Sequence, residues 1–150
     1  MKYEILKDEF IEFDGRKLYR IKALKDFHNV KEGEFGGYIE SERNLSHEGD
    51  AWVSGNARVY GDARVYGDAW VYGNNAVVWF SNVGTENGTL TVYCGKNDLI
   101  ATRGCFTGSV EEFLAKSAEV HDEKTKREYE LLIEVARSRL EEAQGNIGSE

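Results

Sequence analysis

Arginine and aromatic residues recur through the middle of the chain in a pattern suited to binding an anion. Arg58 and Arg64 lie six residues apart, and Arg103 leads into a segment with the character of a helix start. A guanidinium group binds a phosphate or a carboxylate through paired, charge-assisted N–H donors. Aromatic rings nearby would stack on a flat base, and the candidates are Trp52, Tyr60, Tyr66 and Trp70. Together these residues predict a site for a small anionic ligand such as a nucleotide.

Residues with catalytic potential are sparse by comparison. The sequence contains no phosphate loop, dinucleotide-binding fingerprint, HExxH zinc motif or Gly-x-Ser-x-Gly nucleophile elbow. His47 is the one serious candidate for a general base, and no carboxylate at a meaningful spacing marks a partner that would orient it. We therefore expect no catalytic residue, no metal ligand and no cofactor.

A six-residue repeat must position most of the candidate residues. It runs from Ala51 to Asn74 as AWVSGN, ARVYGD, ARVYGD, AWVYGN. Because strand side chains alternate between two faces, each alanine and the valine two residues later point one way, and the tryptophan or arginine between them points the other. The glycine near the end of each repeat is typical of a tight corner. Each repeat predicts one strand and one corner, and three repeats predict a triangular coil of about eighteen residues.

The small-x-aliphatic repeat resembles the hexapeptide repeat of left-handed parallel β-helices. GEFGGYIESERNLSHEGDAWVSGNARVYG is similar to the first repeats of hexapeptide-repeat proteins of bacteria and prophages, and TRGCFTGSVEEFLAKSAEVH to the tail of a phage-associated subset. The resemblance implies a short, single-stranded left-handed parallel β-helix. Many related proteins are acyltransferases that use a histidine base, so the resemblance also implies an enzymatic alternative with acyl-CoA and His47. Those enzymes have longer solenoids and a protruding loop, which this sequence lacks.

The segments on either side of the repeats are expected to cover the ends of the coil. Residues 1–38 alternate apolar and polar side chains around Asp14-Gly15, which predicts an N-terminal β-hairpin cap. Residues 39–84 make up the predicted β-helix. Residues 85–150 predict a strand pair and two α-helices, the first starting with a capping box of Ser109 and Glu112. The expected fold class is therefore mainly β.

Composition restricts the partners and the compartment. The net charge is −8, so no duplex nucleic acid is expected as a partner, because phosphate binding needs a basic surface. No apolar stretch is long enough to span a membrane, and the acidic start MKYEILKDEF is unlike a signal peptide. Cys94 and Cys105 lack metal-ligand spacing and predict reduced thiols. These features predict a cytoplasmic protein of a bacterial host, without a membrane partner.

The function expected from the sequence is non-enzymatic binding by a homo-oligomer, a trimer or a dimer. Positions eighteen residues apart would stack, so Trp52 and Trp70 would form an outward stripe that packs between subunits. A pocket at this interface would sequester a small anionic ligand, such as a nucleotide signal of host immunity, in a phage anti-defence role. Two alternatives stay open: a hexapeptide acyltransferase that uses acyl-CoA, and a structural or protein-interaction module.

Overall fold

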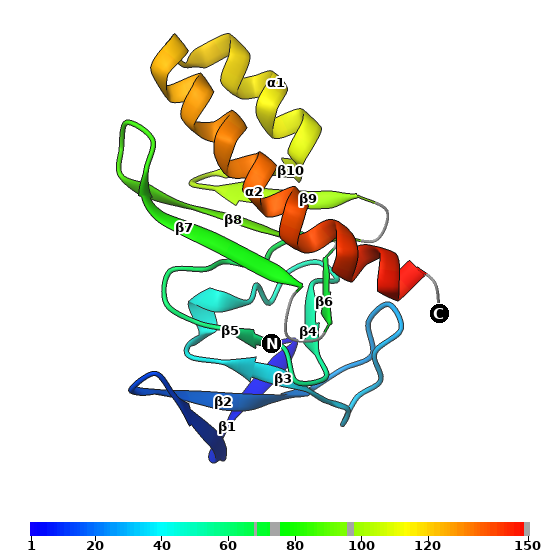
Figure 1. Ribbon diagram of the computed structural model, residues 1–150. Coiled ribbons are helices and arrows are strands. Elements are labelled where there is room, and N and C mark those ends of the chain that lie inside the picture. Colours follow the sequence, from blue (N-terminus) through cyan, green and yellow to red (C-terminus); the bar gives the residue numbers. More distant parts are fainter. Residues whose placement is uncertain (68, 73–75, 96–97, 149–150) are drawn as a thin grey trace.

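The computed structural model of the protein describes residues 1–67, 69–72, 76–95 and 98–148, apart from the side chains of residues 141–148. Figure 1 shows a hairpin at one end of the molecule, the repeat segment in the middle, and a second sheet with two helices at the other end. The described strands form two four-stranded sheets and one two-stranded sheet.

The first sheet has the strand order β1-β2-β3-β5 and holds the N-terminal hairpin. Its strands are β1 (Tyr3–Phe13), β2 (Arg16–Ala23), β3 (Phe35–Ile39) and β5 (Arg58–Val59). β1, β2 and β3 pair in antiparallel fashion, whereas β3 and β5 pair in parallel. Asp14 and Gly15 both have positive φ, 51° and 75°, as a two-residue hairpin turn requires. The predicted hairpin is therefore confirmed.

The chain enters the repeats where β3 passes very close to them. A Cβ atom on Gly36 would lie 2.6 Å from the Val53 carbonyl oxygen, and one on Gly37 would lie 2.6 Å from the Ala57 carbonyl oxygen. Only glycine fits at this approach. A short 3₁₀-helix, η1 (Glu42–Asn44), then leads into the first repeat.

The repeats bury the side chains that the alternation predicts. Their alanines and valines are at most 3% exposed: Ala51, Val53, Ala57, Val59, Ala63, Val65, Ala69 and Val71. Gly55, Gly61 and Gly67 have positive φ, as the predicted corners require, while the corner at Gly73 lies outside the described residues. β4 (Trp52–Ser54) and β6 (Trp70–Tyr72) pair in parallel, with Trp52 opposite Trp70.

The predicted left-handed parallel β-helix of the hexapeptide-repeat type is nevertheless wrong. In the described residues, parallel pairing is confined to β4–β6, β3–β5 and an isolated bridge between Leu45 and Val65, and the other strand pairs are antiparallel. The physical reason is length, since a solenoid needs several complete coils to bury its strands between neighbours. Four repeats give too few stacked coils, so hairpin strands from the flanking segments become the main sheet neighbours.

The second four-stranded sheet is antiparallel and has the order β10-β9-β8-β7. Its strands are β7 (Val77–Val83), β8 (Gly88–Cys94), β9 (Leu99–Arg103) and β10 (Phe106–Ser109). β8 and β9 are the predicted strand pair, and Lys96 and Asn97 between them lie outside the described residues. β7 lies within the segment 39–84 that was expected to be β-helix, but it pairs with β8 in antiparallel fashion.

Two helices cover one face of this second sheet (Figure 1). α1 (Val110–Val120) begins with the predicted capping box, in which Ser109 Oγ accepts from the Glu112 N–H at 3.1 Å and Glu112 Oε1 accepts from the Ser109 N–H at 2.9 Å. α2 (Glu123–Gly148) is the second predicted helix. One stripe of it is buried, and the buried residues are Tyr129, Ile133, Ala136 and Leu140.

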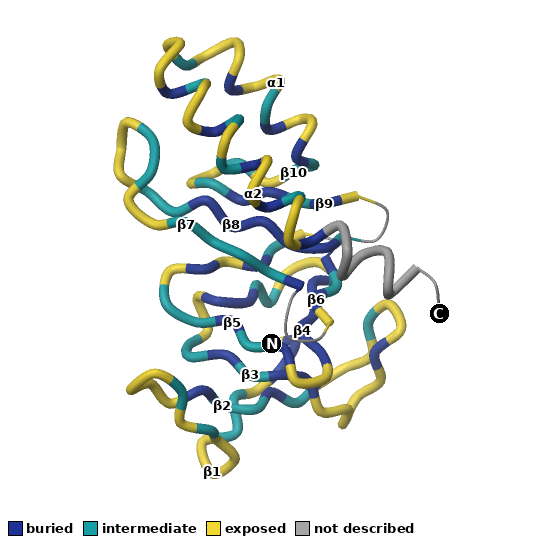
Figure 2. Tube along the Cα trace, viewed as in Figure 1, coloured by how far each residue is buried: buried dark blue, intermediate teal, exposed yellow. Residues whose placement is uncertain are grey.

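One hydrophobic core connects all of these elements. It is continuous from the N-terminal hairpin through the repeats and the second sheet to α2. Figure 2 shows buried segments where the repeats adjoin the hairpin sheet and the second sheet. Among the residues that the structure describes, no helix combines the length and the apolar character needed to cross a bilayer.

Candidate anion-binding cleft

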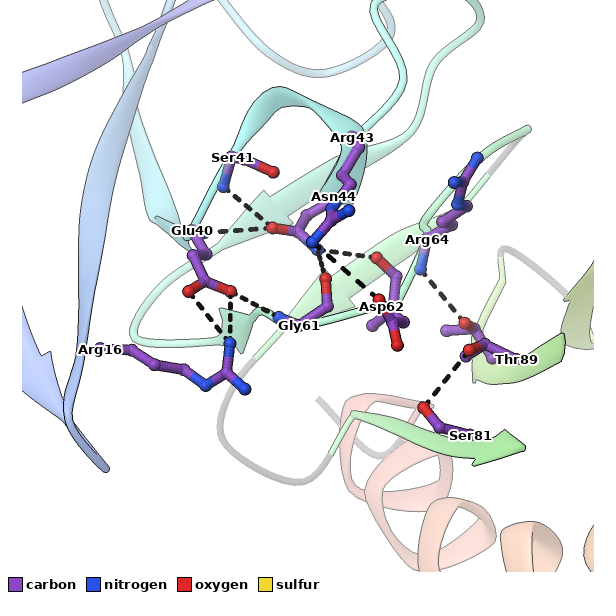
Figure 3. Close-up of polar contacts among 12 residues, drawn as sticks. Arg16, Glu40, Ser41, Arg43, Asn44, Gly61, Asp62, Arg64, Ser81 and Thr89 are labelled. Atoms are coloured by element: carbon purple, nitrogen blue, oxygen red, sulfur yellow. Dashed lines mark hydrogen bonds and ion pairs between the residues drawn. The ribbon is translucent and has the colours of Figure 1, made fainter. Parts of the chain in front are cut away.

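A cleft of about 440 Å³ opens between the repeat segment and the second sheet. It is lined by Asp62, Arg64, Gly88, Thr89, Thr91, Thr102, Arg103, Gly104 and Cys105. Two of the predicted arginines, Arg64 and Arg103, therefore border the same cleft although they are far apart in the sequence. Figure 3 shows one wall of the cleft, with Asp62 and Arg64 on the repeat segment and Thr89 on β8.

Arg64 enters the cleft from a repeat that is fixed to β8 through its backbone. The Arg64 N–H donates to Thr91 Oγ1 at 3.1 Å, and this contact holds the repeat against the strand. The Arg64 side chain is exposed, and its Nη1 donates to the Tyr66 hydroxyl at 3.4 Å. The guanidinium therefore keeps most of its donors free for a ligand.

Arg103 lies at the end of β9 and is held in place from two sides. Its Nε donates to the Tyr129 hydroxyl of α2 at 3.0 Å. A Cβ atom on Gly88 would lie 2.7 Å from Arg103 Cζ, so the absence of a side chain at Gly88 leaves the space that the guanidinium occupies. Arg103 is half-buried, and because it alternates with Thr102 along β9 its guanidinium lies on the α2 side of the sheet, so Arg103 borders the cleft without pointing at Arg64.

A hydroxyl network supports the wall of the cleft between the two arginines. Thr91 and Thr102 lie opposite each other on β8 and β9. The Tyr93 hydroxyl lies 2.6 Å from Thr102 Oγ1, donates to the Tyr66 carbonyl at 2.9 Å and accepts from the Tyr66 N–H at 3.0 Å. Burial raises the pKa of the Tyr93 phenol above its usual value, so this hydroxyl stays protonated. The network fixes the sheet and the repeat relative to each other.

The cleft is cationic although the chain as a whole is acidic. Among the lining residues that the structure describes, Asp62 is the one acid and Arg64 and Arg103 are the bases, and Asp62 lies 3.9 Å from the guanidinium of Arg43 outside the lining. Basic side chains therefore outnumber acidic ones in the described lining. A local excess of positive charge attracts anions at short range, where salt screens little.

The structure separates the other predicted site residues from this cleft. Trp52 was expected on the outer surface but is 1% exposed, with its ring 5.2 Å from Phe27 and 6.5 Å from Tyr3. The N-terminal segment covers this side of the repeats, which is why Trp52 is core. Trp70 is half-buried, with its ring 6.4 Å from that of His28.

Arg58 and Tyr60 belong to the side of the repeats that faces the hairpin. The Arg58 guanidinium lies over the Phe13 ring at 4.9 Å. The Tyr60 ring packs between Phe13, at 5.5 Å, and Trp79, at 4.7 Å. Neither residue lines the cleft, whereas Tyr66 lies beside it through its contact with Arg64.

His47 makes polar contacts through both ring nitrogens. Its Nδ1 accepts from the Lys2 N–H at 3.2 Å, and its Nε2 lies 3.2 Å from Glu42 Oε1. The ring also stacks on Tyr3 at 4.0 Å. With both nitrogens engaged, the imidazole is arranged to hold the N-terminal strand on the first repeat rather than to remove a proton from a substrate.

Sequence reasoning missed Thr89 and Thr91 of the cleft. Thr89 and Thr91 lie two residues apart in the sequence GTLTVY, so the alternation of strand side chains places them on one face. That pattern was visible in the sequence. The face they would share with Arg64 was not visible, because it depends on how the second sheet packs on the repeats.

Comparison with protein-family models found no matching family, and comparison with curated proteins found no match either. The likeness to phage hexapeptide-repeat proteins gains no support from these comparisons, and the β-helix that it implied is replaced by the fold of three sheets.

Proposed function

We propose that this protein is a non-enzymatic binding protein that takes a small phosphate- or carboxylate-bearing molecule, such as a nucleotide, into the cleft between Arg64 and Arg103. The observation that carries the proposal is the cleft itself, in which the exposed Arg64 side chain lies beside threonines of β8 and β9 and Arg103 borders one end. Charge-assisted hydrogen bonds from arginine are among the strongest that a protein makes to such anions.

The size and the lining of the cleft favour recognition of the anionic group. A volume of about 440 Å³ falls in the range of small-molecule sites. Of the predicted aromatic residues, Tyr66 lies beside the cleft, while Trp52, Tyr60 and Trp70 do not line it. The phosphate of a nucleotide therefore has named partners, and Tyr66 is the residue that would contact a base. Two free cysteines fit a reducing compartment, and we propose binding in the bacterial cytoplasm.

Calorimetric titration with pyrophosphate, AMP and a cyclic nucleotide tests this function. We expect at least one of these anions to bind, and we expect Arg64→Ala to weaken binding about 10- to 100-fold, the value of a charged hydrogen bond. Arg58→Ala is the matched control, because Arg58 occupies the same position of the preceding repeat but contacts Phe13.

Two results would contradict the proposal. One is the absence of heat with every anion tested. The other is an equal loss of binding in Arg58→Ala and Arg64→Ala, since that pattern would indicate a general charge effect rather than the cleft.

The acyltransferase alternative has less support than anion binding. It requires a free imidazole nitrogen, and both nitrogens of His47 are in contact with Lys2 or Glu42. A protein-interaction role has a specific observation in its favour, which is the open edge of β7 described below.

A further inference from the structure

A second, apolar groove of about 540 Å³ runs along the outer edge of β7. It is lined by Tyr60, Val77, Val78, Trp79, Phe80, Val135, Arg139 and Leu140. The lining includes consecutive residues of β7, whose side chains point to opposite faces of the sheet. The groove therefore follows the strand edge itself, with α2 on one side and Tyr60 of the repeats on the other.

The backbone of β7 offers hydrogen-bonding groups to this groove. β7 is the terminal strand of the order β10-β9-β8-β7, and no other described strand pairs with its outer edge. The Cys94 N–H donates to the Ala76 carbonyl. In an antiparallel pair, Ala76 and every second residue after it along β7 therefore direct their N–H and C=O groups inward to β8. The N–H and C=O groups of Val77 and Trp79 consequently point outward. An unpaired edge of this kind is a template for another strand.

The neighbouring face of α2 is apolar in its centre and carries opposite charges at its two ends. Leu131 and Val135 are 45% and 47% exposed. Glu128 lies one turn before Leu131, and its carboxylate accepts from the Gly84 N–H beyond the end of β7. Arg139 lies one turn after Val135, beside Leu140, whose carbonyl contacts Cys94 near the start of β7. The helix thus runs antiparallel to β7, with an acid at one end of the groove and a base at the other.

We propose that this surface binds a second copy of the same chain, through antiparallel pairing of β7 with the partner's β7 about a twofold axis near Trp79. Such an axis reverses the direction of both β7 and α2. It brings Arg139 of one copy toward the partner's Glu128, and the partner's Arg139 toward Glu128 of the first copy. The exposed Leu131 and Val135 are covered near the axis, and the two sheets join into one. A surface with opposite charges at its ends is complementary to itself under this symmetry. The inference is independent of the anion-binding cleft.

Sedimentation velocity between about 1 and 100 μM tests the dimer. We expect the wild-type protein to reach twice its monomer mass of 17.0 kDa within this range. Val135→Asp places a charge in the centre of the interface and is expected to weaken association at least 100-fold. Val120→Asp is the matched control, because Val120 is 57% exposed at the end of α1 and should leave the dimer intact.

Charge reversal identifies the pairing geometry. Arg139→Glu and Glu128→Lys should each be monomeric alone, because each creates two like-charge contacts in its homodimer. An equimolar mixture of the two should form a heterodimer, because all four charges are then complementary. Circular dichroism shows whether each variant is folded. A monomeric wild-type protein at 100 μM, or a dimer that survives Val135→Asp, would overturn the proposal.

Discussion

At the scale of single residues, identical positions of the repeat have different roles. Arg58 and Arg64 follow alanine in two consecutive copies of ARVYGD. Arg58 packs on Phe13 of the hairpin, whereas Arg64 opens into the cleft beside β8. The corner between them turns the chain from one neighbouring sheet to the other. The environment of each arginine is therefore set by the segment that covers its side of the repeats.

The two cysteines provide a direct measure of cleft occupancy. Cys105 is exposed and lines the cleft, while Cys94 is buried, and this burial raises the pKa of its thiol. We expect the neutral reagent iodoacetamide to alkylate one thiol rapidly and the other only on unfolding, because the thiolate reacts and must be accessible. Cys105→Ser should remove the fast phase, and an anion that binds the cleft should slow it severalfold. Equal protection of both thiols would place the anion elsewhere.

The buried side chain of Lys2 leads us to expect that the free energy of unfolding rises in mildly alkaline solution. It is 1% exposed, its Nζ donates to the Ala51 carbonyl, and burial lowers the pKa of Lys2 to about 8. An unfolded lysine keeps its proton up to about pH 10.4, so between these pH values the unfolded state binds more protons and stability increases with pH. From pH 7 to pH 9.5, the free energy of unfolding measured with urea should rise by about 2 kcal/mol more in the wild-type protein than in Lys2→Met. An unchanged difference between the two proteins would contradict this assignment.

At the scale of elements, short strands depend on side chains for their attachment. β5 spans Arg58–Val59 and β4 spans Trp52–Ser54, so each contributes few ladder hydrogen bonds. Asn44 compensates in part, because its side-chain amide donates to the carbonyls of Gly61 and Ala63, as Figure 3 shows for Gly61. These contacts fix the corner of the repeats at Gly61.

Tyr93 and Thr91 both join β8 to the repeats, and Tyr93 does so through two hydrogen bonds to the backbone of Tyr66. Tyr93→Phe leaves the part-buried N–H and carbonyl of Tyr66 without the partner they have now. We expect a loss of about 1–3 kcal/mol in the free energy of unfolding, measured by urea denaturation. Tyr72→Phe is the control, since Tyr72 is 49% exposed and should change stability by less than about 0.5 kcal/mol. Equal effects of the two substitutions would refute the role given to Tyr93.

At the scale of the whole molecule, the repeats act as a middle layer between two sheets. The hairpin sheet covers one side through Phe13 and Tyr3, and the β7–β10 sheet covers another through Thr91 and Tyr93. The same packing creates the cationic cleft at one junction and leaves the edge of β7 open. The proposed ligand site and the proposed self-association surface therefore lie on different parts of the second sheet.

Local patterns in the sequence determined the features that depend on neighbouring residues. The Asp14-Gly15 hairpin, the Ser109–Glu112 capping box and the inward alanines and valines follow from turn chemistry and side-chain alternation. Alternation assigns a residue to a face but does not say what covers that face. Tertiary structure alone decided that Trp52 is buried, that antiparallel strands replace a β-helix, and that Arg64 and Arg103 border one cleft. Each of these outcomes depends on contacts between segments distant in sequence, which a six-residue period does not specify.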